Sequence, residues 1–314
     1  MTLRPDMQTI IDMLVSSGTP PMETGSVADA RLMAGAMTQF GGSGPSVAGV
    51  QNLAIPRTHG SGMIPARLFT PDRPLIGVIA YFHGGGWVLG DLEGYDALAR
   101  VLAVESRCAV LLVDYRLAPE FRFPAAVMDC LDAVDWLGRE TVSLFAKALP
   151  LIVAGDSAGG NLAAVAAQRA PSQVPSIAAQ VLVYPVMNAD FATDSYAMYA
   201  EGPLLTRATM KWFWDHYAPD LASRSGPMAA PGRCFDLAGL PPAIVVTAEV
   251  DPLRDEGEAY ADALAAAGVA VARRRFDGVT HGFFGMVNLV AASRQAIGFV
   301  ASELQSLLAA HTSI

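Results

Sequence analysis

Apolar residues along the chain fall into continuous runs and spaced patterns that follow one another, which indicates alternating strands and helices. The alternation is regular from about residue 48 onward, and no internal repeat interrupts it. The continuous runs are rich in β-branched residues, as is typical of strands that are buried on both faces. They occupy residues 75–82, 108–115, 150–155, 180–186 and 243–250, and 271–276 closes the series.

Spaced apolar positions between these runs predict helices. The predicted helices cover residues 94–106, 124–139, 158–170, 254–267 and 288–309. Earlier in the chain, 49–55 and 62–69 read as two short strands around Gly60-Ser61-Gly62, which predicts an antiparallel hairpin at the edge of a sheet. Alternating strands and helices imply a mostly parallel sheet with helices on both faces, so the predicted fold class is α/β.

Two segments do not follow this alternation of predicted strands and helices. Residues 1–46 contain an amphipathic stretch and a Gly-rich end, and 188–238 is rich in aromatic side chains. We interpret both segments as parts of a helical cap. The chain is then a single domain, with a core made of 47–187 and 239–314.

Composition and charge narrow the class of protein. Hydrophobic residues make up 52% of the chain and charged residues 16%, which excludes a disordered chain and indicates a compact globule. The net charge of -9 is spread over many Asp and Glu residues, so no nucleic-acid partner is expected. The three cysteines form no CxxC pair, so neither a disulfide framework nor a metal site is expected. Asp6 lies where a signal peptide needs an apolar run, and no apolar segment reaches spanning length, so we expect a cytoplasmic protein.

The sequence Gly155-Asp156-Ser157-Ala158-Gly159 follows a predicted buried strand and precedes a predicted helix. A nucleophile elbow requires this order of strand, turn and helix, and small flanking residues permit the sharp turn. Ser157 is therefore the candidate nucleophile. The alternative interpretation is a Gly-rich helix start that caps the helix or binds phosphate.

The run His83-Gly84-Gly85-Gly86 follows another predicted strand by one tight step. Successive glycines expose backbone N–H groups that no side chain blocks, as an oxyanion hole requires. We expect the N–H groups of Gly85, Gly86 and Ala158 to bind the oxyanion, and His83 and Gly84 to support the turn. The alternative is a flexible loop without a role in chemistry.

A serine hydroxyl needs a base, which elimination among the five histidines identifies as His281. His83 belongs to the glycine turn, His59 to the early hairpin, His216 to the predicted cap, and His311 to the chain end. His281 lies between the last predicted strand and the last helix, where it can reach the carboxyl ends of the strands.

The acid of such a site is expected between the serine and the histidine, and Asp251 directly follows the predicted strand 243–250. The same aspartate precedes a proline and also fits a helix N-cap. Asp255 is the rival acid, and Asp190 is a third candidate. Neighbouring Arg116 and Glu120 are interpreted as structural, since charges beside a buried strand end usually pair to fix a loop.

Several of these motifs together resemble the hormone-sensitive lipase family of bacterial carboxylesterases. The motifs are HGGGW at 83–87, DYRLAPE at 114–120, GDSAGG at 155–160, DPLRDEG at 251–257 and THGF at 280–283. The resemblance covers essentially the whole chain. It implies an α/β-hydrolase fold with an eight-stranded sheet and a helical cap, which cleaves short-to-medium acyl esters without a metal or organic cofactor.

The resemblance also carries the family's site residues onto this chain. It implies Ser157 as nucleophile, Asp251 as acid and His281 as base, with the oxyanion donors on Gly85, Gly86 and Ala158. Val250 departs from the pattern, because an aromatic residue often precedes the acid, and this departure concerns the shape of the pocket and not the chemistry.

Other functions remain open on the same residues. An amidase or lactonase would use the same triad, since esters and amides pass through the same tetrahedral oxyanion. A non-catalytic ligand receptor on this scaffold is a second alternative, although such receptors usually lose the base. The expected partner is a small-molecule ester. A homodimer is possible through the edge strand 271–276, whose unpaired backbone favours pairing and whose arginines oppose it.

Overall fold

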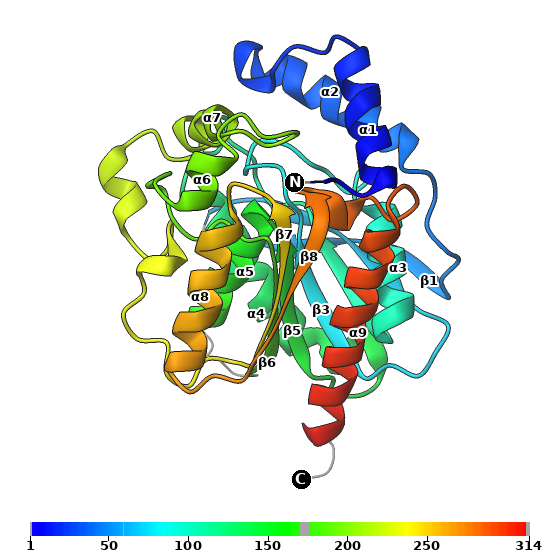
Figure 1. Cartoon of the computed structure of the whole chain (residues 1–314). Coiled ribbons are helices and arrows are strands. Elements are labelled where there is room, and N and C mark those ends of the chain that lie inside the picture. Colours follow the sequence, from blue (N-terminus) through cyan, green and yellow to red (C-terminus); the bar gives the residue numbers. More distant parts are fainter. Residues whose placement is uncertain (1, 59, 170–175, 312–314) are drawn as a thin grey trace.

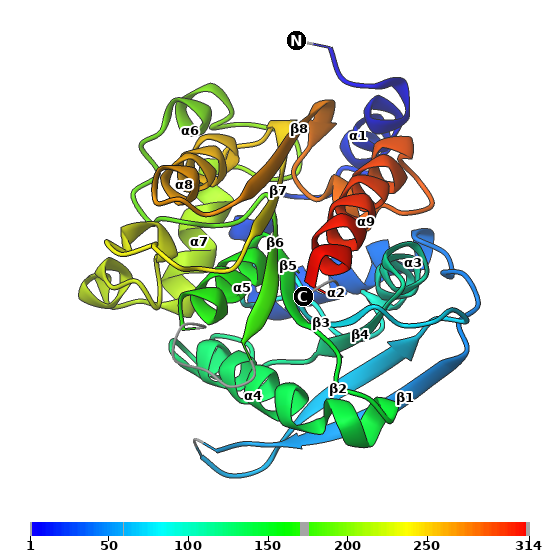
Figure 2. The same ribbon diagram turned by 90° about the horizontal axis from the view of Figure 1, so that it is seen from below.

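The computed structural model describes residues 2–58, 60–169 and 176–311. Within these residues, eight strands form one sheet in the order β1-β2-β4-β3-β5-β6-β7-β8 (Figures 1 and 2). The hairpin of β1 and β2 is antiparallel, as is the pairing of β2 with β4, and all other neighbours are parallel. The predicted α/β class and the eight-stranded sheet are confirmed.

The strands and helices follow one another along the chain as the hydrophobic pattern predicted. The strands are β1 (Gly49–Pro56), β2 (Met63–Thr70), β3 (Gly77–Phe82), β4 (Cys108–Val113), β5 (Leu151–Asp156), β6 (Ile177–Val183), β7 (Ala243–Val250) and β8 (Val271–Thr280). The helices that pack on the sheet are α3 (Asp96–Ser106), α4 (Ala125–Phe145), α5 (Ala158–Gln168), α8 (Arg254–Ala266) and α9 (Ala291–His311). The segments outside this rhythm hold α1 (Pro5–Ser16), α2 (Val27–Phe40), α6 (Asp194–Met198) and α7 (Arg207–Tyr217). Short 3₁₀ turns occupy Met22–Thr24, Leu221–Ser225, Pro231–Arg233 and Phe283–Gly285.

Alternate residues of each buried strand enter two different cores, one on each face of the sheet. In β3, Val78 and Phe82 pack with residues of α4, α5 and α8, whereas Ile79 and Tyr81 pack with residues of α3 and α9. Figure 2 shows these two sets of helices on opposite faces. Burial on both faces explains why these strands have continuous apolar sequences.

The strand β8 runs further than the sequence predicted. The expected strand ended at 276, directly before Asp277-Gly278. The pairing of β7 with β8 instead shifts register after Ala248 and resumes at Val250, opposite Thr280. Gly278 has a φ of 69°, so it supplies the left-handed conformation that such a bulge requires. The strand therefore continues to the residue before His281.

The carboxyl ends of the parallel strands point toward α2, α6 and α7, which lie beyond that end of the sheet (Figure 1). Loops that follow β3, β5, β7 and β8 meet at this end, where open α/β sheets bind their ligands. The action of 1–46 and 188–238 as a cap stays a prediction.

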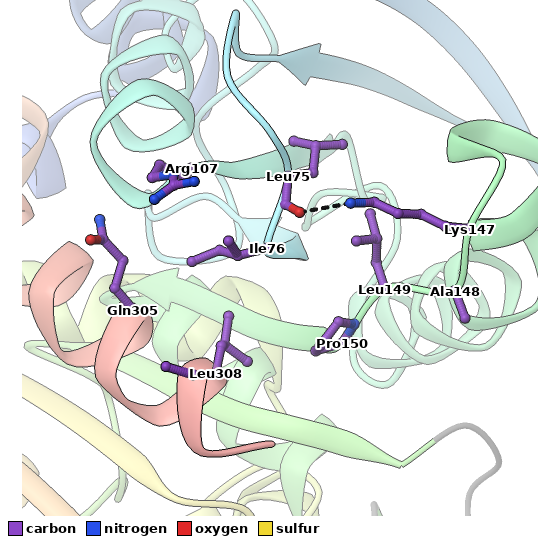
Figure 3. Close-up of a pocket in the computed structure, with 10 residues that line it drawn as sticks. Leu75, Ile76, Arg107, Lys147, Ala148, Leu149, Pro150, Gln305 and Leu308 are labelled. Atoms are coloured by element: carbon purple, nitrogen blue, oxygen red, sulfur yellow. Dashed lines mark hydrogen bonds between the residues drawn. The ribbon is translucent and has the colours of Figure 1, made fainter. Parts of the chain in front are cut away.

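A cavity of about 410 Å³ lies at the opposite, amino end of the sheet (Figure 3). Leu75 and Ile76 precede β3, and Leu149 and Pro150 precede β5, so this cavity is a strand's length from Ser157. It belongs to the packing of the sheet and not to the candidate site.

The two edges of the sheet are formed by β1 and β8, and β8 contains the predicted edge strand 271–276. Arg273 pairs with Asp262, and Arg275 with Glu258, so carboxylates of the same chain offset the charges expected to oppose pairing. A homodimer through this edge stays a prediction. Among the described residues, no helix is long and apolar enough to cross a membrane.

Candidate active site

Ser157 lies on a sharp turn between β5 and α5. Its φ of 55° and ψ of -118° belong to a conformation that a non-glycine residue adopts only under constraint. The N–H of Ser157 donates to the carbonyl of Val183 at 2.9 Å, which ties the turn to the next strand. A Cβ atom at Gly159 would collide with the carbonyl oxygen of Phe82. The small residues beside Ser157 are therefore required by the close approach of β3.

Ser157, His281 and Asp251 form a row of hydrogen bonds. The Nε2 atom of His281 lies 2.9 Å from the Oγ of Ser157, and its Nδ1 lies 2.8 Å from Oδ2 of Asp251. The carboxylate is fully buried, and the histidine side chain is 12% exposed. The ring of Tyr184 packs beside the imidazole with 4.5 Å between centroids. Three loops that are far apart in the sequence thus meet at one point.

Asp251 also serves the local backbone, as its alternative interpretation required. Its Oδ1 accepts a hydrogen bond from the N–H of Leu253 at 2.9 Å, while Oδ2 faces His281. The two interpretations of this aspartate are therefore compatible, because each uses a different oxygen.

The rival carboxylates are engaged elsewhere. Asp255 accepts hydrogen bonds from the N–H of Ser195 at 2.7 Å and from the Arg254 guanidinium at 2.8 Å. Partial burial acts to raise the pKa of Asp255, but these hydrogen bonds outweigh burial and lower it. Asp190 is exposed and accepts from the N–H of Ala192.

The glycine loop after β3 presents backbone N–H groups. In the described parts of the chain, the N–H groups of Gly85 and Gly86 make no backbone hydrogen bond. Ala158 is the first residue of α5, so its N–H has no intrahelical acceptor. Gly86 has a φ of 61°, and a Cβ there would collide with the ring of Phe213 from α7. Only glycine fits this loop beneath that ring.

His83 contacts the glycine loop and the residues that pack against it. Its Nδ1 lies 2.8 Å from the carbonyl of Gly84, and its ring stacks on Tyr115 with 4.4 Å between centroids. The Tyr115 hydroxyl donates to the carbonyl of His83 at 2.7 Å. Complete burial lowers the pKa of His83 to about 4, so the imidazole is neutral at physiological pH.

Acidification is expected to destabilise the protein through His83. Between pH 6.5 and about 4 the unfolded chain binds a proton at this residue that the folded chain does not, so stability falls as pH falls. The loss of unfolding free energy approaches about 3 kcal/mol and levels off below pH 4. Denaturant unfolding at several pH values in the wild type and in His83→Gln measures it. Between pH 6.5 and 4, the unfolding free energy should fall less steeply with falling pH in the variant than in the wild type. Parallel curves would show that His83 does not cause this pH dependence.

A further carboxylate, Asp156, joins the glycine loop to the nucleophile turn and was missed as a functional residue. One oxygen accepts from the Tyr81 hydroxyl at 2.8 Å and the N–H of Gly84 at 3.0 Å, and the other accepts from Tyr95 at 3.0 Å. Burial raises the pKa of Asp156, against the hydrogen bonds from the tyrosines, which favour its ionised form. Asp156 is a charged residue at the end of the buried strand β5, and this position could have marked it as functional in the sequence.

Charged residues near the site have structural partners. Arg116 binds Asp129 of α4 at 2.8 Å, and Glu120 binds Arg31 of α2 at 2.7 Å. Arg116 and Glu120 therefore fix the loop, as expected, but through these partners on α4 and α2 and not through each other. Arg31 also donates to the carbonyls at 88 and 118, and sequence reasoning missed it because its partners are distant in the chain.

The remaining histidines are His59, His216 and His311, and His311 ends α9. His216 lies in α7 and its Nδ1 is 2.9 Å from the carbonyl of Trp212. His59 lies outside the described residues. Within the part of the chain that the structure describes, no cluster of His, Cys, Asp or Glu side chains could hold a metal ion.

The arrangement provides a hydroxyl beside an imidazole, a carboxylate behind the imidazole, and backbone donors on a neighbouring loop. A base within 2.9 Å of the hydroxyl can take its proton as the oxygen attacks an electrophile. N–H groups without acceptors can stabilise an oxyanion that forms during such an attack.

Comparisons with known proteins agree with this chemistry. A family model described as the α/β-hydrolase fold matches residues 79–285. The carboxylesterase NlhH of Mycobacterium tuberculosis is 41% identical over 75% of this chain and 76% of its own length. Ethyl acetate hydrolase of Pseudomonas putida is 35% identical over 98% of this chain and 100% of its own. The hyperthermophilic esterase of Pyrobaculum calidifontis has a TM-score of 0.91 at 36% identity, over 98% of this chain and 99% of its own.

Proposed function

Because this chain belongs to the hormone-sensitive lipase-like family of α/β hydrolases and is a carboxylic ester hydrolase, we propose that it works through an acyl-enzyme on Ser157. The observation that carries the proposal is the continuous row of hydrogen bonds from Ser157 through His281 to Asp251. Both bonds are within the range in which protons move between side chains.

In the first step, the Oγ of Ser157 attacks the ester carbonyl carbon while His281 takes the hydroxyl proton at Nε2. The carbonyl oxygen becomes an oxyanion, for which Gly85, Gly86 and Ala158 supply N–H donors. Asp251 holds the imidazole in the required tautomer and stabilises its positive charge. Collapse of the intermediate breaks the ester C–O bond, and His281 returns its proton to the departing alcohol.

In the second step, water attacks the acyl carbon and His281 takes its proton. The second tetrahedral intermediate releases the carboxylic acid and restores the Ser157 hydroxyl. Each oxyanion-hole donor typically contributes about 3 kcal/mol to lowering such barriers.

Phe213 is the basis for the proposed substrate class, esters of short-to-medium acyl chains. Its ring lies against Gly86, beside the donors that receive the carbonyl oxygen, and it is only 5% exposed. The ring therefore occupies space next to the reacting carbonyl into which a long or bulky acyl chain would extend. The ethyl acetate hydrolase named above acts, by its name, on an ester with a two-carbon acyl group.

A series of p-nitrophenyl esters from acetate to laurate tests this class. We expect kcat/KM to fall beyond medium chain length, and Phe213→Ala to raise the ratio of octanoate to acetate turnover about tenfold, because the cavity adds room for methylenes. Phe235→Ala is the matched control, because Phe235 lies in the same segment and is fully exposed. A rate that rises steadily to laurate in the wild type would contradict the proposal. The corresponding anilide, assayed in parallel, separates an esterase from an amidase.

A further inference from the structure

The first helix of the chain contacts the polypeptide directly before His281. The N–H of Arg4, at the start of α1, donates to the carbonyl of Gly278 at 2.8 Å. The sulfur of Met7 accepts a hydrogen bond from the hydroxyl of Thr280 at 3.3 Å. Thr280 is the last residue of β8 and is bonded covalently to His281. Contacts with α1 and the residue before it thus hold the segment that precedes His281.

The same helix also contacts the end of the loop that follows His281, where α9 begins. Oδ2 of Asp6 accepts a hydrogen bond from the N–H of Ala291 at 2.8 Å, and Ala291 is the first residue of α9. The first N–H groups of a helix lack intrahelical acceptors, so Asp6 caps α9 from another helix. Oδ1 of Asp6 accepts from the N–H of Met7 at 2.9 Å, which fixes the orientation of the carboxylate.

The segment after α2 adds a contact in the middle of the loop. The side-chain amide of Asn288 donates to the carbonyls of Gly41 and Ser43 at 2.7 and 3.1 Å. Contacts from the first 46 residues are therefore made at 278, 280, 288 and 291, on both sides of His281.

Helix α1 packs against the protein through the same residue that contacts Thr280. Within α1, Met7 is the buried residue, at 0% exposure, whereas Met13 and Val15 are exposed by 58% and 74%. Figures 1 and 2 both place α1 beside the end of β8 and the start of α9. Met7 packs in the core that contains α9, not in the core that contains the aromatic residues of α7. Helix α1 is therefore placed to affect the histidine loop and not the core that contains Phe213.

We propose that α1 is a positioning element for the catalytic base, with Asp6 and Met7 as the positioning residues on the two sides of the His281 loop. The proposal rests on the proposed role of His281. The imidazole must stay within reach of both Ser157 and Asp251 while its proton moves, and small displacements of a reacting group reduce rates strongly. Anchors at 278, 280 and 291 restrict the loop to the conformation in which both hydrogen bonds form.

Substitution of Asp6 tests the proposal. We expect Asp6→Ala to lower kcat about tenfold with KM within about twofold of the wild type, since the loop is loosened and the pocket is unchanged. Asp6→Asn should restore kcat, because its side-chain oxygen still accepts from the N–H of Ala291. Asp12→Ala is the matched control: Asp12 is exposed on the same helix and accepts from the Gln8 side chain. It should behave as the wild type.

A spectroscopic readout separates positioning from a general loss of stability. We expect the proton between Nδ1 of His281 and Asp251 to give a far-downfield NMR resonance in the wild type, to broaden in Asp6→Ala and to persist in Asp6→Asn and Asp12→Ala. If Asp6→Ala does not fold, Met7→Leu keeps the apolar volume and removes the sulfur acceptor, which leaves the Thr280 hydroxyl with the carbonyl of His281, at 3.2 Å, as its other acceptor. We expect this variant to lower kcat about threefold at unchanged KM.

Several results would overturn the proposal. They are an unchanged kcat and resonance in Asp6→Ala and Met7→Leu, a loss carried by KM, an equal loss in Asp12→Ala, or no recovery in Asp6→Asn. Failure of the proposed function is distinguishable, because His281→Ala would then retain turnover. If His281→Ala is inactive and Asp6→Ala is normal, only the role of α1 is refuted.

Discussion

Replacement of Ser157 by alanine is expected to lower kcat by about 10⁶-fold, because the residues of a triad fail as a unit once the nucleophile is absent. The fold should be unaffected. The Ser157 hydroxyl bonds to His281, and its backbone N–H bond to Val183 is kept in the variant. Initial rates on p-nitrophenyl acetate, with thermal unfolding of the same sample, measure both parts of the prediction.

Ser143→Ala is the matched control for this experiment. Ser143 is exposed on α4, where its hydroxyl bonds to Glu140 of the same helix. Its loss should leave kcat unchanged. Turnover by Ser157→Ala within a hundredfold of the wild type would show that another group attacks the ester.

Replacement of Asp251 by asparagine is expected to lower kcat by about 10⁴-fold. The asparagine oxygen can still accept from the N–H of Leu253, so the turn before α8 is preserved. Its amide group then faces Nδ1 of His281, and the imidazole adopts the tautomer that cannot take the Ser157 proton at Nε2. The loss therefore reports on the acid and not on the fold.

Asp255→Asn decides between the two acids that the sequence left open. Asp255 bonds to Arg254 and to the N–H of Ser195, so its substitution should lower kcat by less than about tenfold. Kinetics of both variants on the same ester give the comparison. A larger loss in Asp255→Asn than in Asp251→Asn would assign the acid to Asp255.

The fold was readable from the sequence because strands buried on both faces leave continuous apolar runs. The errors of the sequence-based prediction concern the residues at which individual helices and strands end. Helix α4 extends to Phe145, beyond the predicted end at 139, and β8 passes through the Asp277-Gly278 pair that resembles a turn. In β8 the pairing with β7 continues the strand beyond this pair, which no local pattern could indicate.

The candidate site was readable where chemistry depends on residues adjacent in sequence, such as Ser157 between small residues. Contacts between distant segments were not. Asp6 and Ala291 are 285 positions apart, and Arg31 and Glu120 are 89 apart, so no local pattern connects them. Asp6 was noticed only as a charge that interrupts a signal peptide, although in the structure it caps the helix after His281. Such pairs depend on the packing of α1 and α2, which the sequence did not place.

Covalent trapping of the nucleophile tests the central claim most directly. The protein is incubated with a p-nitrophenyl alkylphosphonate, and the modified peptide is then identified by mass spectrometry. The account predicts one adduct per chain, on Ser157, with matching release of p-nitrophenolate, strong slowing in His281→Ala and no adduct in Ser157→Ala. A stoichiometric adduct on another residue, or loss of esterase activity with Ser157 unmodified, would contradict it.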